Sequence, residues 1–130
     1  MAKGEGSVRI VHVMADEMGK IFLTREALAK IAGIACTECY GVVGMAKRTP
    51  GELIGSLLGI ENVSQGVQVR IERDEVHLTL FVILLYGIRI SEVIENIREQ
   101  VKYRISSMTH LNNFTLDVVV CHVKDMNNQG

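Results

Sequence analysis

The sequence predicts one α+β domain in which two main helices pack on one face of a small mixed β-sheet. A chain of 130 residues is long enough to bury one core. Segments in which apolar and polar residues alternate are separated by segments in which apolar residues recur every three or four positions, as in a helix. The segment Val76–Tyr86 is rich in β-branched and aromatic residues, which indicates a central strand. We expect the order strand, helix, strand, hairpin, helix, strand over residues 7–123, between a mobile tail (1–6) and a polar tail (124–130).

The first third of the chain predicts two short strands and a helix. Residues 7–14 alternate and suit an edge strand, although whether this strand joins the sheet is left open. Residues 15–19 form a turn, and residues 20–23 form a second short strand. Thr24 can cap a helix that runs to about Tyr40. Gly33 in mid-helix costs about 1 kcal/mol relative to Ala, so we expect a close approach to the sheet there.

The middle and end of the chain supply the remaining elements. Residues 41–45 predict a short strand, 47–51 an irregular segment, 53–58 one or two helical turns, and 61–66 a loop. Residues 67–73 alternate and fold back on the central strand through a turn at 73–75. A long helix follows from Ser91 as N-cap to about Met108, with an apolar stripe of Ile94, Ile97, Val101, Ile105 and Met108. Residues 114–123 form the last strand.

The central strand is apolar on both of its faces over its second half. Its even positions are apolar throughout, and its odd positions become apolar at Phe81, Ile83 and Leu85. Burying each such side chain stabilises by roughly 1.5–3 kcal/mol, so a second cover over this face is expected. The chain is also 48% apolar, with a mean hydropathy of +0.22. We therefore predict that Phe81, Ile83 and Leu85 contact another subunit or partner, and that the protein is a homo-oligomer.

The composition excludes several classes of function. The net charge is −1 and the chain has no Trp, which argues against a nucleic-acid partner. An odd count of three cysteines, with no apolar leader after Met1, suits a reducing, cytoplasmic setting. The longest apolar run, Leu80–Tyr86, is far shorter than the ~20 residues that a membrane-spanning helix needs. We expect no small-molecule substrate and no cofactor.

Cys36 and Cys39 form a C-x-x-C pair, the weak candidate for metal or redox chemistry. A reactive thiol of this kind sits at a helix N-terminus, whereas this pair falls near the end of a predicted helix. Structural zinc needs four ligands. The neighbours Cys121 and His122 in a strand point to opposite faces, so at most one of them could join. The alternative is that Cys36 and Cys39 are two ordinary helix residues, one packed in the core and one near the surface.

Other candidate groups give no site. The four histidines fall in different elements, and a nucleophile would need a base and an orienting group in reach. His77 and Asp117 could face each other across the sheet. Gly41-Val42-Val43-Gly44 resembles the backbone clamp of RNA-binding KH domains, but its middle is apolar and only Lys47 and Arg48 follow. These residues predict no enzyme, and a small metal- or RNA-binding module is the alternative.

Taken together, the segments resemble the alkaline shock protein family, envelope-stress proteins of Gram-positive bacteria. The resemblance spans about residues 19–123 and rests on the order and spacing of Gly19-Lys20-Ile21, Ile31–Ala35, Gly41–Met45, Gly66–Ile71, Tyr86–Ile90, Val93, Asn96, Val101 and Met108-Thr109. Ser91 stands where the family has proline, and His110 where it has glycine. The resemblance implies a cytoplasmic, non-enzymatic protein that self-associates. It also implies peripheral association with the inner face of the membrane through a small membrane-anchored protein partner.

Overall fold

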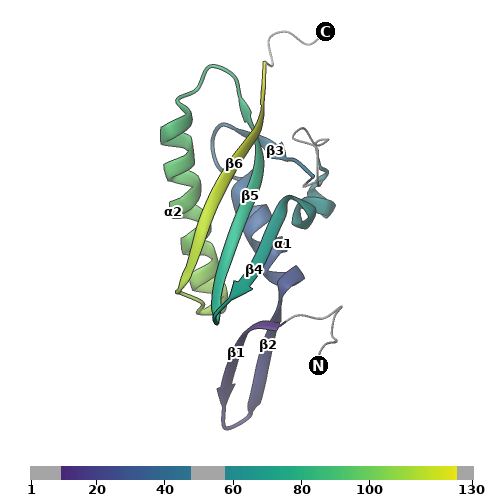
Figure 1. Ribbon diagram of the computed structural model, residues 1–130, viewed down its shortest axis with the longest axis vertical. Helices are drawn as coiled ribbons and strands as arrows, with labels where there is room; N and C mark the ends of the chain where they lie inside the picture. Colours follow the sequence, from purple (N-terminus) through teal and green to yellow (C-terminus); the bar gives the residue numbers. More distant parts are fainter. Residues whose placement is uncertain (1–9, 48–57, 126–130) are drawn as a thin grey trace.

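A four-stranded mixed sheet carries the fold, with β5 (Glu75–Leu85) at its centre. The computed structural model describes residues 10–47 and 58–125, so the predictions for both chain ends and for most of 47–58 lie outside the described residues. β6 (Phe114–Lys124) runs parallel to β5 along one side. On the other side, β4 (Val67–Glu72) and β3 (Val42–Met45) pair antiparallel with successive parts of β5. The predicted mixed sheet is confirmed (Figure 1).

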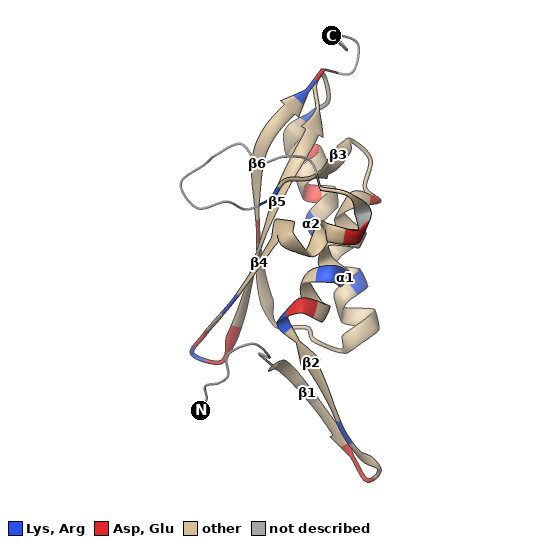
Figure 2. Cartoon of the chain, turned by 90° about the vertical axis from the view of Figure 1, so that its right-hand side faces the viewer, with Lys and Arg blue, Asp and Glu red and all other residues tan. Residues whose placement is uncertain are grey.

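Two helices, α1 (Arg25–Thr37) and α2 (Ile90–Thr109), cover one face of this sheet, as predicted (Figure 2). The even positions of β5 face them, and Val76, Leu78, Leu80, Val82 and Leu84 are at most 4% exposed. Facing these side chains are buried residues of both helices, and the core cluster includes Leu28, Ala32, Cys36, Val93, Ile97, Val101 and Ile105. The opposite side of the sheet, which we call the outer face, has no helix over it in the described part of the chain.

The turn between β4 and β5 is a two-residue hairpin connection. Arg73 (φ 52°) and Asp74 (φ 67°) both adopt positive φ between the paired residues Glu72 and Glu75. Positive φ at both central residues is the signature of a type I′ turn, whose twist matches that of the flanking strands. The predicted antiparallel hairpin is therefore confirmed.

Helix α1 begins as predicted and ends earlier. The Thr24 hydroxyl accepts a hydrogen bond from the backbone N–H of Ala27 (3.1 Å), but the helix ends at Thr37 rather than near Tyr40. Gly33 does approach another element closely, yet that element is not the sheet. A Cβ at Gly33 would lie 3.0 Å from Val63 in η1, a 3₁₀ helix over Ile60–Gly66 where we expected a loop.

Helix α2 differs from the prediction in its first residue and in which of its residues face the core. Its N-cap is Arg89, so Ser91 is not the capping residue. The buried stripe is Val93, Ile97, Val101, Ile105 and Thr109, a spacing of four residues, which leaves Ile94 only half-buried and Met108 58% exposed. At the C-terminal end, His110 takes the left-handed conformation (φ 64°), the role that glycine usually fills.

The strand predicted over residues 7–14 does not join the main sheet. β1 (Ile10–Asp16) pairs antiparallel only with β2 (Gly19–Thr24), and the two form a separate hairpin that we call the arm. The arm projects beyond the end of the main sheet where β4 turns into β5 (Figures 1 and 2). Val11 and Leu23 near its base pack against the core. We expected an edge strand here. The alternation of residues identifies a strand, but it does not reveal with which strand it pairs.

Candidate functional site

The outer face of the sheet is polar at one end. His77 pairs in register with Thr115 of β6, and its Nδ1 lies 2.8 Å from the Thr115 hydroxyl oxygen. The Nε2 atom of His77 is 3.8 Å from a carboxylate oxygen of Glu75. Asp117 pairs with Thr79 rather than with His77. The suggested His77–Asp117 juxtaposition is therefore replaced by a His77–Thr115 contact on a strand pair, which is an ordinary surface arrangement of a sheet.

The other end of the outer face is apolar. In register, Phe81 lies beside Val119, and Leu85 lies beside Lys124. Val119 is 41% exposed, and Phe81 and Leu85 are half-buried, so we name these three residues the outer patch. Ile83 shares this face but is only 4% exposed in the single chain. Of the three residues predicted to contact a partner, Phe81 and Leu85 remain partly accessible, whereas Ile83 is almost completely buried.

The arm exposes more large apolar side chains than the outer patch does, and the sequence did not lead us to predict this. Ile10 is 45%, Ile21 61% and Phe22 54% exposed, and Met18 in the turn is 95% exposed. Adjacent strand residues point to opposite faces, so Ile21 and Phe22 make both faces of the arm apolar. The consecutive residues Ile21-Phe22-Leu23 in a short strand with a tight turn before it were the available signal.

The Cys36–Cys39 pair lies inside the core. Cys36 is fully buried and Cys39 is 8% exposed. Burial first, and then the neighbouring Cys39, raise the pKa of the Cys36 thiol to about 12. Burial and then Glu38 raise the pKa of Cys39, while Arg104 acts in the opposite direction. Both side chains are therefore protonated thiols at neutral pH, the unreactive form.

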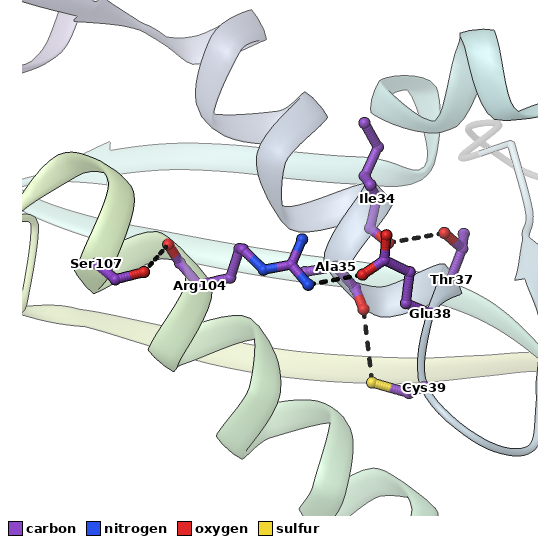
Figure 3. A network of polar contacts seen from close by, with 7 residues as sticks. All are labelled: Ile34, Ala35, Thr37, Glu38, Cys39, Arg104 and Ser107. Carbon is purple, nitrogen blue, oxygen red and sulfur yellow. Dashed lines mark hydrogen bonds and ion pairs between the residues drawn. The ribbon is translucent and has the colours of Figure 1, made fainter.

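Contacts around Cys39 are structural. Its thiol lies 3.5 Å from the carbonyl oxygen of Ala35, which it can reach as a weak donor. Next to it, Arg104 of α2 donates to Glu38 at the end of α1 (2.6 Å), and this ion pair joins the two helices (Figure 3). Among the described residues, no group of three or more His, Cys, Asp or Glu side chains is arranged to hold a metal ion. The redox and zinc interpretations find no support here.

The segment that resembled an RNA-binding clamp is part of the sheet. Gly44 is buried in β3 and pairs in register with Ile83. Gly41 (φ 88°) accepts a hydrogen bond from the backbone N–H of Leu85 (2.9 Å). A backbone clamp needs free N–H and C=O groups on an exposed loop, and here strand pairing uses them. Lys47 is exposed, and Arg48 lies outside the described residues.

A shallow depression follows the exposed side of α2 and offers no catalytic arrangement. Its lining comes from one helix alone, namely Ser91, Glu92, Ile94, Glu95, Arg98, Glu99 and Lys102. Charges of both signs three and four residues apart are typical of a solvated helix surface. In the part of the chain that the structure describes, no helix is both long enough and apolar enough to cross a bilayer.

Comparison with known proteins identifies relatives over nearly the whole domain. The model of the alkaline shock protein family, described as having a cell envelope-related function, matches residues 13–126. The chain is 36% identical over 115 residues to YloU of Bacillus subtilis (strain 168), covering 88% of this chain and 96% of that protein. It is 35% identical over 107 residues to Spy1614 of Streptococcus pyogenes serotype M6, covering 82% and 88% respectively. A search of solved structures gave no significant match.

Proposed function

This chain belongs to the alkaline shock protein family, and from that premise we propose that it is a non-enzymatic scaffold of the cell envelope. In this proposal, copies of the chain associate through the outer face of the sheet. A small membrane-anchored protein then holds the assembly at the inner face of the membrane. The family's cell envelope-related function supports the setting, and the chain's own surface supports the association.

The observation that carries the proposal is the apolar end of the outer face, over which none of the helices in the described residues lies. α1 and α2 cover the opposite side of the sheet, and Val119 in the outer patch is 41% exposed. Covering a side chain of this kind stabilises by roughly 1.5–3 kcal/mol when burial is complete. A partner that covered the outer patch would gain a part of this energy from each of its three side chains, because each is already partly buried, and this gain favours association over a solitary chain.

Analytical ultracentrifugation tests the association directly. We expect the wild-type chain to sediment as an oligomer at micromolar concentration, and Phe81→Asp to dissociate with its helical circular dichroism unchanged. An exposed-site control is Tyr103→Asp, because Tyr103 lies on α2 and is 69% exposed. A wild-type chain that stays monomeric at this concentration would refute self-association. A Phe81→Asp chain that unfolds would show that Phe81 belongs to the internal core and that the interface is elsewhere.

Recovery from membranes tests the second part of the proposal. The tagged chain should co-purify from detergent-solubilised membranes with a small membrane protein in fixed stoichiometry. The same protein should be recovered with the Tyr103→Asp control. If the tagged chain is recovered from the membrane fraction without any partner, or is absent from that fraction, docking through a membrane-anchored protein is wrong.

A further inference from the structure

No further inference is drawn: the strongest candidate, the arm of β1 and β2 with Ile21 and Phe22 more than half exposed on its two faces, is an apolar surface beyond the end of the main sheet, and nothing in the described residues shows what covers it.

Discussion

Alkaline pH should destabilise this fold through Cys36, and the size of the effect follows from its burial. The thiol is completely buried in α1, and burial raises its pKa from 9.0 to about 12. Between these two values the unfolded chain has released the proton and the folded chain still holds it. Because the unfolded state then binds fewer protons than the native state, the free energy of unfolding falls as pH rises.

The expected loss at about pH 10 is about 1.4 kcal/mol, since this pH is one unit above the unfolded pKa and still below the folded one. Urea unfolding of wild type and Cys36→Ala at about pH 8 and about pH 10 measures it. Cys36→Ala is destabilised by lost packing at both pH values. Only the wild type loses, in addition, the part of its free energy of unfolding that depends on the Cys36 proton. The stability difference between the two proteins should therefore shrink by about 1.4 kcal/mol at the higher pH.

An unchanged difference would refute this reasoning. So would alkylation of Cys36 in the native protein at the rate found in the unfolded chain, because such reactivity requires an accessible thiolate. That result would restore the redox or metal interpretation of the Cys36–Cys39 pair. The other ionisable groups are present in both proteins, so their contributions cancel in the difference.

Three further substitutions test the local structure, each by urea or thermal unfolding. Thr24→Ala removes the hydroxyl that accepts from the Ala27 amide and should destabilise by about 1 kcal/mol; no change would mean that the cap is not formed. His110→Gly should stabilise by roughly 0.5–1 kcal/mol, because a non-glycine residue at φ 64° is strained, and destabilisation would contradict this. Gly66→Ala should destabilise by about 1–3 kcal/mol, since its Cβ would lie 2.8 Å from the Met45 Cβ, and wild-type stability would show that this region adjusts freely.

Features set by neighbouring residues in the chain could be predicted from the sequence. The Thr24 cap needs only a hydroxyl three residues before a free amide, and the structure forms it. The β4–β5 hairpin needs only two alternating segments around a short turn. The burial of every even position from Val76 to Leu84 follows from the two-residue period of a strand.

Features set by distant contacts could not be predicted. Alternation in residues 10–16 indicates a strand but does not say that it pairs only with β2 and leaves the sheet. Gly33 indicates a close approach, yet its partner, Val63, is thirty residues away in a segment expected to be a loop. Ser91 is a good capping residue by type, but the inward face of α2 is set by Val93 and Ile97, and the helix starts two residues earlier, with Arg89 as its N-cap. Packing between elements decided each of these cases.

The exposed apolar surface that the composition implied lies mainly on the arm rather than on β5, for a geometric reason. A central strand has neighbours on both sides, so β3 and β6 shield its side chains even where no helix lies above them; Ile83 is 4% exposed. Each strand of the arm has one neighbour, and Phe22 is 54% exposed. If association depends on the apolar surface that it covers, Phe22→Asp should weaken it more than Phe81→Asp does. The opposite order in sedimentation would show that the central strand, not the arm, dominates the interface.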